Sequence, residues 1–395
     1  MKKTKRVLSI ILIIAILLLL PQAALADALP SDANALNTLP MDTSAKAVLL
    51  MDVKTRTVIG ELNADEKLDV STISKSMSLL LFIEAIENGQ LHLEDELSIS
   101  VNATKTGGVR AFLDHSETYK VDTLLKCVQM ISANDACLAL AEAVSGTEEA
   151  FVELMNQKAQ DLGLTNTYFM NCTGQTISGQ YSTARDIATI SIELLKHETY
   201  YKHSKTYMEM LMHKSGRETE LVNPNRLVRS YTGADGIQTG SSTDAGYCLA
   251  GSAKRGELGL VCVVLGAQNS AERFNTATQM LDYGFANFTN VSVVRAGETA
   301  KKNVEVKGGD KSRVNIVAQE DVNLLVRKGE EQFITKEVEM EESLLAPLNR
   351  EVVAGKLIIK NNETVIKEIN LYPQEDVAER TLMNSFLRVI RLWIR

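Results

Sequence analysis

One stretch of the chain reads DVSTISKSMS (residues 69–78) and continues directly into the apolar run LLLFI (residues 79–83). Ser and Thr are favoured at helix starts, so the pattern predicts a helix that begins near residue 71 and ends near Asn88-Gly89. A hydroxyl three or four places before a lysine shares a helix face with the amine, beside the positive end of the helix dipole. A neutral amine there can take the hydroxyl proton, and free N–H groups of the first turn can stabilise an oxyanion. Ordinary helix caps use the same residue types, so downstream motifs must decide between the two interpretations.

Length and composition indicate a globular protein of two or more domains. The chain has 395 residues, of which 45% are hydrophobic, and this is enough for a sizeable core. Aromatic residues make up only 5%, and no basic stripe with interleaved aromatics is present. This composition argues against a nucleic-acid partner.

Residues 1–26 have the three parts of a secretory signal peptide. A positive segment (residues 2–6) precedes an almost wholly apolar one (residues 7–20), and an Ala-x-Ala sequence for cleavage stands at residues 24–26. An uncleaved membrane anchor is the alternative, but the apolar segment is short for a span. Cleavage changes the formal net charge from −8 to −12, because four positive side chains are removed. We expect an acidic protein outside the cytoplasmic membrane, with a polar leader over residues 27–43.

Cysteine and histidine usage gives no sign of a metal site. The cysteines form no Cys-x-x-Cys pair, and the five histidines are scattered along the chain. An odd number of cysteines in an exported chain leaves at least one free thiol, and we expect most of them to be small buried residues. The cysteines are Cys127, Cys137, Cys172, Cys248 and Cys262.

Apolar patterns predict the elements around the first helix. A β-hairpin over residues 45–61 leads into that helix, and later helices are expected over 121–131, from 134 and over 148–162. Two or three neighbouring strands follow within residues 235–266, where glycines allow close approach of backbone or substrate.

Two downstream motifs hold further polar side chains. Ser132-Ala133-Asn134 lies at the junction of two predicted helices, where it can be an ordinary cap or can present a hydroxyl for proton relay and an amide for a substrate. The other motif, DGIQTGS (residues 235–241), opens the predicted strands; an ordinary strand edge is the alternative interpretation.

The three motifs, in this order, resemble those of the low-molecular-weight penicillin-binding proteins. The resemblance is to the serine-type D-alanyl-D-alanine carboxypeptidases of the penicillin-recognising acyl-transferase superfamily, whose signature is Ser-x-x-Lys, Ser-x-Asn and Lys-Thr-Gly. It covers residues 40–290, includes Arg273-Phe274, and continues into the tail. It implies an α/β (α+β) β-lactamase/transpeptidase-like catalytic domain, with an antiparallel sheet and a helical cluster, over residues 44–292.

The resemblance also implies a role for each motif residue. Thr72 would attack the carbonyl of the penultimate D-Ala, Lys75 would act as the base, and Ser132 would relay a proton to the leaving D-Ala. Asn134 would hold the substrate amide, and the backbone N–H groups of residues 72 and 241 would form the oxyanion hole. No metal or organic cofactor is implied. The strand along the substrate would contribute Gln238, Thr239, Gly240 and Ser241.

Two residues depart from the signature. Thr72 stands where the family has its nucleophilic serine, and Gln238 stands where it has the lysine of the third motif. Losing that charge weakens a contact with a carboxylate by about 1.5–3 kcal/mol, or roughly 10- to 100-fold, and the Thr72 methyl group crowds the site. Ser71 is an alternative nucleophile because it shares a helix face with Lys75. It lies about 100° around the axis from residue 72, which favours Thr72.

The C-terminal part has a different pattern. Short alternating runs separated by turns predict a small all-β domain over residues 297–374, as the β-sandwich of the family would be. Residues 376–395 predict an amphipathic helix with arginines on its polar face, which argue against a span and favour an anionic bilayer surface. Packing of this helix on its own domain is the alternative.

Three functional hypotheses follow. The first is an exported carboxypeptidase, peripheral on the outer face of the cytoplasmic membrane or in the cell wall, which removes the terminal D-Ala from peptidoglycan stem peptides through an acyl-enzyme and binds β-lactams. The second is a catalytically degenerate relative that binds peptidoglycan or scaffolds other wall proteins, because both the serine and the lysine are missing. A β-lactamase is a third hypothesis, which the tail domain and helix suit less well.

Overall fold

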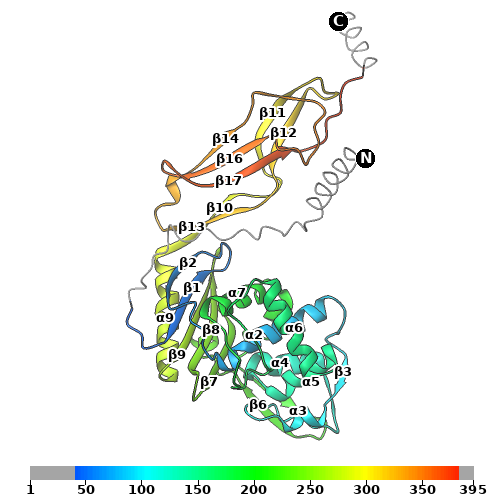
Figure 1. Ribbon diagram of the computed structural model, residues 1–395, viewed down its shortest axis with the longest axis vertical. Helices are drawn as coiled ribbons and strands as arrows, with labels where there is room; N and C mark the ends of the chain where they lie inside the picture. Colours follow the sequence, from blue (N-terminus) through cyan, green and yellow to red (C-terminus); the bar gives the residue numbers. More distant parts are fainter. Residues whose placement is uncertain (1–40, 382–395) are drawn as a thin grey trace, which may run out of the picture. The chain divides into compact units, whose positions relative to one another are not determined.

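The computed structural model describes residues 41–381 (Figure 1). The predicted signal peptide, most of the predicted leader and residues 382–395 of the predicted membrane helix lie outside the described residues. Within residues 41–381, none of the helices has the length and apolar character needed to cross a membrane.

A five-stranded antiparallel sheet forms the centre of the larger, N-terminal part of the chain, with the strand order β2-β1-β9-β8-β7 (Figure 1). The predicted hairpin and the predicted strands within residues 235–266 are therefore confirmed. Strand β7 lies at one edge of the sheet, so one side of its backbone is free for other contacts. The strands are β1 (Ala47–Asp52), β2 (Val58–Leu62), β7 (Ala234–Ser242), β8 (Gly246–Arg255) and β9 (Leu258–Ala267).

Helices cover both faces of this sheet (Figure 1). Successive residues of β1 face opposite layers, as the period of a strand requires: Leu49 belongs to the core under the helical cluster, and Leu50 to the core under α9 (Ser270–Asn287). All five cysteines are buried free thiols, as expected for most of them. The main helices of the cluster are α2 (Lys75–Glu87), α4 (Val121–Ile131), α5 (Asn134–Ser145), α6 (Glu148–Asp161) and α7 (Ala184–Leu194).

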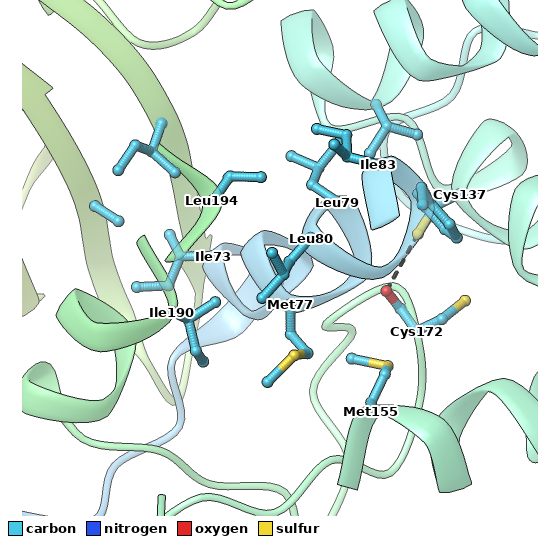
Figure 2. Close-up of a cluster of buried hydrophobic side chains, with 14 of the residues drawn as sticks. Ile73, Met77, Leu79, Leu80, Ile83, Cys137, Met155, Cys172, Ile190 and Leu194 are labelled. Atoms are coloured by element: carbon cyan, nitrogen blue, oxygen red, sulfur yellow. Dashed lines mark hydrogen bonds between the residues drawn. The ribbon is translucent and has the colours of Figure 1, made fainter. Parts of the chain in front are cut away.

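Helix α2 is buried on nearly all sides at the centre of the cluster. It ends at Asn88 and Gly89, with Gly89 at φ +75°, as the sequence predicts. A helix with no exposed face needs no polar stripe, which explains its run of apolar residues. Figure 2 shows its side chains packed among residues of α5, α6 and α7, and the labelled residues include Met77, Leu79, Leu80, Cys137, Met155, Ile190 and Leu194.

The start of this helix differs from the prediction. Residues Ser71–Ser74 form a 3-10 turn, η1, before α2 begins at Lys75. Ser71 has φ +50°, a left-handed conformation that non-glycine residues rarely adopt and that a regular α-helix excludes. The Asp69 carboxylate accepts the Ser71 N–H at 2.7 Å and stabilises this conformation.

The predicted helix pair around Ser132 is confirmed. Helix α4 ends at Ile131, and Ser132 adopts a left-handed conformation with φ +60°. The Ser132 N–H donates to Val128 O at 3.1 Å, which satisfies an end carbonyl of the helix. Helix α5 then begins at Asn134, so Ser132 and Asn134 both lie at a tight turn between two buried helices.

The region before α4, where the sequence shows no regular pattern, contains β3 (Glu96–Ser98), α3 (Val101–Lys105) and β4 (Thr118–Lys120), with a loop over residues 106–117. A buried carboxylate, Asp135, accepts the N–H groups of Ala111 at 2.9 Å and Leu113 at 3.0 Å and so fixes this loop against α5. The remaining elements of this part are η2 (Glu198–Lys202), β5 (Met208–Met212), β6 (Glu218–Val222) and α8 (Leu227–Ser230).

An all-β domain follows α9, as predicted. A six-stranded sheet with the order β14-β16-β17-β12-β11-β15 and the pair β10-β13 enclose a separate apolar core, which includes Ile316, Ile359 and Leu371. The elements are β10 (Phe288–Val294), β11 (Thr299–Lys307), β12 (Arg313–Ala318), β13 (Val322–Arg327), η3 (Glu331–Phe333), β14 (Ile334–Glu339), β15 (Ser343–Leu345), β16 (Gly355–Asn361) and β17 (Thr364–Pro373).

The predicted start of the closing helix at residue 376 is wrong. Residues 376–381 are extended, and Val377 exchanges backbone hydrogen bonds with Leu348 at 2.9 Å in both directions. The Val377 side chain is fully buried in the core of the β domain. A residue within the range predicted for the surface helix thus closes the β domain.

Replacement of Asp135 tests how the loop over residues 106–117 is held. Asp135→Ala should lower the free energy of unfolding by about 2–4 kcal/mol, because it leaves two buried N–H groups without an acceptor. Urea unfolding followed by circular dichroism measures this. The exposed Glu153 of α6 provides the control, and Glu153→Ala should change stability by less than about 0.5 kcal/mol. Equal effects of the two substitutions would contradict the prediction.

Candidate active site

A pocket of about 410 Å³ lies beside the edge strand β7. Thr72 of the first motif, Ser132 and Asn134 of the second, and residues 239–241 of the third all line it. The motifs are far apart in the sequence, and the fold brings them to one site. The other lining residues are Ser71, Gly108, Val109, Ile131, Gly174, Gln175, Thr176, Pro224, Ser242 and Arg273.

Thr72 lies against the backbone of β7. Its hydroxyl donates to Thr239 O at 3.1 Å. Gly240 makes this approach possible, because a Cβ atom at that position would lie 2.9 Å from both Thr72 N and Thr72 Oγ1. The glycine of the third motif is therefore required by the close packing of the strand on the 3-10 turn.

Lys75 is fully buried beneath the pocket and does not line it. Its ammonium group donates to Thr173 O. Burial lowers the pKa of Lys75 to about 8, against a smaller opposing effect of the Cys137 and Cys172 side chains. These cysteines are neighbours, since Cys137 Sγ donates to Cys172 O at 3.2 Å (Figure 2). Within residues 41–381, no hydrogen bond joins Lys75 to Thr72.

The loop that accepts the hydrogen bond of the Lys75 ammonium also contacts the 3-10 turn η1. Gly174 has φ +68°, and a Cβ atom there would lie 2.6 Å from Ser71 O and 2.8 Å from Thr72 Cα. Only glycine combines this conformation with this close approach. Thr173 and Gly174 thus connect the amine to the backbone that carries Thr72.

Ser132 and Asn134 leave polar atoms without protein partners in the described structure. Asn134 Nδ2 donates to Gly107 O at 2.7 Å. Asn134 Oδ1 and Ser132 Oγ are buried, and neither has a hydrogen-bond partner within residues 41–381. Buried polar atoms of this kind are costly unless a ligand or water satisfies them. Both residues line the pocket, so a bound substrate can supply the partner.

Ser71, the alternative nucleophile, also lines the pocket. It is more buried than Thr72, at 2% exposure, and its backbone is held at φ +50°. The 3-10 geometry of η1 also removes the α-helical spacing that would place Ser71 and Lys75 on one face.

Gln238 does not line the pocket. Its side chain is buried, and Nε2 donates to Val128 O at 3.1 Å. Val128 O is the same carbonyl that accepts the Ser132 N–H. The first residue of the third motif is therefore hydrogen-bonded to the end of α4, whereas Thr239, Gly240 and Ser241 line the pocket.

Arg273, in the first turn of α9, is a site residue to which motif analysis gives no role. Its guanidinium donates to Gly240 O at 2.9 Å and to Cys248 O at 3.1 Å, and the side chain is almost completely buried. Burial lowers the pKa of Arg273, but an arginine stays protonated in proteins. Its Nε atom has no partner among the described residues. Arg273 thus places a positive charge on the wall formed by the third motif.

Comparison with known proteins identifies the family. Residues 33–269 match the protein-family model described as D-alanyl-D-alanine carboxypeptidase. The chain belongs to this family. Residues 288–379 match the model of the penicillin-binding protein 5 C-terminal domain, which corresponds to the all-β domain.

Relatives of this carboxypeptidase family match over most of the chain. The D-alanyl-D-alanine carboxypeptidase DacF of Bacillus subtilis is 35% identical over 342 residues, which are 86% of this chain and 88% of DacF. DacC of Escherichia coli is 35% identical over 334 residues, or 82% of this chain and 81% of DacC.

Solved structures confirm the fold. Penicillin-binding protein 5 of Haemophilus influenzae superposes with a TM-score of 0.78 at 29% identity, over 87% of this chain and 100% of that chain. An ampicillin-bound form of penicillin-binding protein D2 from Listeria monocytogenes matches with a TM-score of 0.56 at 27% identity, over 63% of this chain and 100% of that chain. The catalytic-type domain and the all-β domain both follow the pattern that the resemblance implies.

The titration of Lys75 can be measured through stability. The unfolded chain, with an ordinary lysine pKa of 10.5, keeps a proton between pH 8 and 10.5 that the folded protein has released, so the free energy of unfolding rises with pH in this window. Below pH 8 both the folded and the unfolded state hold the proton, and the full cost of burying the Lys75 ammonium group remains. Lys75→Met lacks the buried amine, so its free energy of unfolding should exceed that of the wild type at pH 7. This difference should shrink by about 2 kcal/mol between pH 7 and pH 10.

Urea unfolding of both proteins at several pH values measures this difference. Lys302→Met, at an exposed position of the β domain, is the matched control and should show no such trend. The prediction fails if the difference in the free energy of unfolding between the wild type and Lys75→Met does not change with pH. Lys75 would then titrate in the ordinary range.

Proposed function

We propose that this protein is an exported D-alanyl-D-alanine carboxypeptidase that removes the terminal D-Ala from peptidoglycan stem peptides and is acylated by β-lactams, with Thr72 as its nucleophile. The observation that carries the proposal is the convergence of Thr72, Ser132, Asn134 and residues 239–241 on one pocket, in a chain of this family. The D-alanyl-D-alanine carboxypeptidases among its relatives and the ampicillin-bound structure of a similar protein support the substrate class.

Thr72 is a better candidate than Ser71 because its side chain is less buried and lies at the edge of β7, where a substrate carbonyl can approach. Lys75 is the proposed base. With a pKa of about 8, roughly one amine in ten is neutral at pH 7 and able to accept a proton. In the resting state both groups donate to carbonyls, Thr72 to Thr239 O and Lys75 to Thr173 O. The Thr72 hydrogen bond has to be given up before its proton can pass to Lys75, whereas a neutral Lys75 amine can accept the proton on its lone pair and still donate to Thr173 O.

The proposed reaction has two steps. The Thr72 oxygen forms a bond to the carbonyl carbon of the penultimate D-Ala while its proton goes to the Lys75 amine, and N–H groups of residues 72 and 241 stabilise the oxyanion. The C–N bond to the terminal D-Ala then breaks, and the leaving amine receives a proton through the Ser132 hydroxyl. Water next hydrolyses the Thr72 ester, which restores the hydroxyl and releases the shortened peptide.

We infer that Arg273 binds the terminal carboxylate of the substrate, since Gln238 cannot supply the charge of the family's lysine. Arg273 is charged, lines the pocket and has an unpartnered Nε donor. Its bond to Gly240 O fixes it beside the third-motif strand. Asn134 is proposed to hold the substrate amide on the opposite wall.

The proposal places the protein outside the cytoplasmic membrane. The support is the charged, apolar and Ala-x-Ala sequence of residues 1–26 and the arginine-rich amphipathic pattern that ends the chain. Because residues 376–381 belong to the β domain, the proposed surface helix is confined to residues 382–395, which lie outside the described residues. The proposed domains are otherwise the signal peptide (1–26), the leader (27–43), the catalytic domain (44–292) and the β domain (297–374).

A catalytically degenerate wall-binding protein is the second candidate. The observation that favours it is the resting hydrogen bond of Thr72 to Thr239 O, which turns the hydroxyl to the strand, together with the threonine side chain itself. A β-branched side chain has a restricted χ1 angle, so rotation towards Lys75 is harder for threonine than for serine.

Acylation by a fluorescent penicillin separates the two candidates. We expect the wild-type protein to form one covalent adduct, seen on a gel and by intact mass, and to release D-Ala from a D-Ala-D-Ala peptide. Thr72→Ser should raise the second-order acylation rate about 10-fold or more, because it removes the methyl group from a tight site. Absence of label and adduct at saturating drug would leave the degenerate candidate.

Two further variants locate the nucleophile within the same experiment. Thr72→Ala should abolish the adduct, whereas Ser71→Ala should still form it. The reverse pattern would move the nucleophile to Ser71.

The role of Arg273 is tested with paired substrates. Arg273→Gln should lower kcat/KM about 10- to 100-fold for a peptide that ends in a free carboxylate, because a hydrogen bond to a charged group is lost. A peptide with a C-terminal amide should be affected much less. Arg229→Gln, at an exposed position of α8, is the control for net charge. Equal losses on both peptides would indicate damage to the fold instead of lost carboxylate binding.

A further inference from the structure

Three exposed methionines share one face of the β5–β6 hairpin (β6 in Figure 1). Strand β5 reads MEMLM, and Met208, Met210 and Met212 are 53%, 45% and 60% exposed. Alternate residues of a strand lie on one face, so these three side chains form a continuous row, the methionine face. None of them lines the active-site pocket. The methionine face is therefore separate from the site described above.

The other face of the hairpin is fixed to the helical cluster. Leu211 and Leu221 are buried in the core under that cluster, and Glu209 forms an ion pair with Lys126 of α4 at 2.5 Å. A shift by one residue would exchange the two faces and expose the leucines. The methionines therefore stay on the solvent side of the hairpin.

The choice of methionine on this face is explained neither by strand formation nor by apolar contact. Strands favour β-branched and aromatic side chains, and an apolar face for a partner protein could be built from those residues equally well. Methionine differs from them in its thioether sulfur, a soft, polarizable group on a side chain with three rotatable bonds. Soft ligands of this kind favour Cu(I).

The spacing allows neighbouring sulfurs to share one ion. Residues two apart in a strand are separated by about 6.6 Å, and two sulfurs on one ion lie up to about 4.6 Å apart when each metal–sulfur bond is about 2.3 Å. Flexible side chains that lean towards each other close this gap. Met210 lies between the other two methionines in β5, which makes it the central ligand.

Strand β6 adds negative charge beside the sulfurs. Glu220 is the register partner of Met210, and Glu218 is the partner of Met212. Paired residues lie on the same face of a sheet, so both carboxylates border the methionine face. Both are exposed, and within residues 41–381 neither forms an ion pair. This border attracts a cation to the thioethers.

The ligands that Zn(II) and Cu(II) prefer are absent from this face. His213 follows Met212, but its side chain is buried and hydrogen-bonded to Tyr119 and Thr219. All five cysteines are buried. Among the described residues, no group of three or more His, Cys, Asp or Glu side chains could hold a metal ion. Neutral thioethers with a carboxylate border therefore suit a soft monovalent ion better than a divalent one.

We propose that Met208, Met210 and Met212 form a surface site for a soft monovalent metal ion, Cu(I), with Met210 as the central ligand and Glu218 and Glu220 as its electrostatic border. Binding forms metal–sulfur bonds and transfers no electron or proton. The site shares no residue with the pocket, so this inference is independent of the proposed function.

Titration of the full-length protein with Ag(I) tests the site, because Ag(I) is also soft and monovalent and needs no reductant. Isothermal titration calorimetry in chloride-free buffer should show about one ion bound per chain at the methionine face. Met210→Leu should weaken this binding at least about 10-fold, since loss of even an outer partner of a metal site costs about 10- to 100-fold in affinity. Replacement of all three methionines by leucine should remove it.

Two further measurements identify the ion and the border. Anaerobic competition for Cu(I) with bicinchoninate should rank the variants in the same order, and Zn(II) should not displace Ag(I). The double variant Glu218→Gln/Glu220→Gln should bind Ag(I) about three-fold more weakly at low salt, with a smaller difference at high salt.

The matched control is Met170→Leu, at a methionine outside β5 that is 40% exposed. It should leave the affinity for Ag(I) unchanged. Exposed Met→Leu changes should alter stability by less than about 0.5 kcal/mol, which circular dichroism during urea unfolding checks. Ag(I) affinity that is equal in the wild type and the triple leucine variant would overturn the inference and assign any bound ion to another group. Displacement of Ag(I) by Zn(II) would also overturn it.

Discussion

The burial of one amine constrains the catalytic part of this structure. Lys75 opens a helix that is itself buried on nearly all sides, and its ammonium group needs an acceptor inside the protein. Thr173 O supplies it, so the loop at residues 173–174 lies against the 3-10 turn η1. Gly174 allows that approach to Thr72 Cα. The apolar core, the loop and the turn therefore form one unit, and the low pKa of the amine follows from how the core is packed.

The edge strand β7 contributes to the site through its backbone. Gly240 allows the strand to approach Thr72 closely, and Gly240 O accepts a hydrogen bond from the Arg273 guanidinium. One glycine thus contacts both Thr72 and the positive charge of the pocket. Within residues 41–381, β8 is the sheet partner of β7, and the other edge of β7 borders Thr72 and the pocket, where an extended substrate can align along it.

Sequence reasoning succeeded where a short-range pattern fixes the structure. The end of α2 at Gly89, the turn at Ser132 and the strands within residues 235–266 all follow from caps, glycines and periodicity. It failed where a long-range contact overrides the local pattern. Asp69 holds Ser71 at positive φ, and Val377 lies in the core of the β domain instead of in the predicted closing helix. The position of Arg273 in the pocket could not be predicted from a local pattern, because its hydrogen-bond partners lie 33 and 25 residues away, in β7 and β8.

The glutamine at residue 238 separates two properties that a lysine there would combine. As a donor, Gln238 holds Val128 O and thereby supports the helix end that sets the conformation of Ser132. As a neutral group, it adds no further cation to a region that already contains Lys75 and Arg273 and whose pocket has no lining carboxylate. The third motif therefore supplies a neutral donor, and the positive charge that lines the pocket lies on Arg273 of α9.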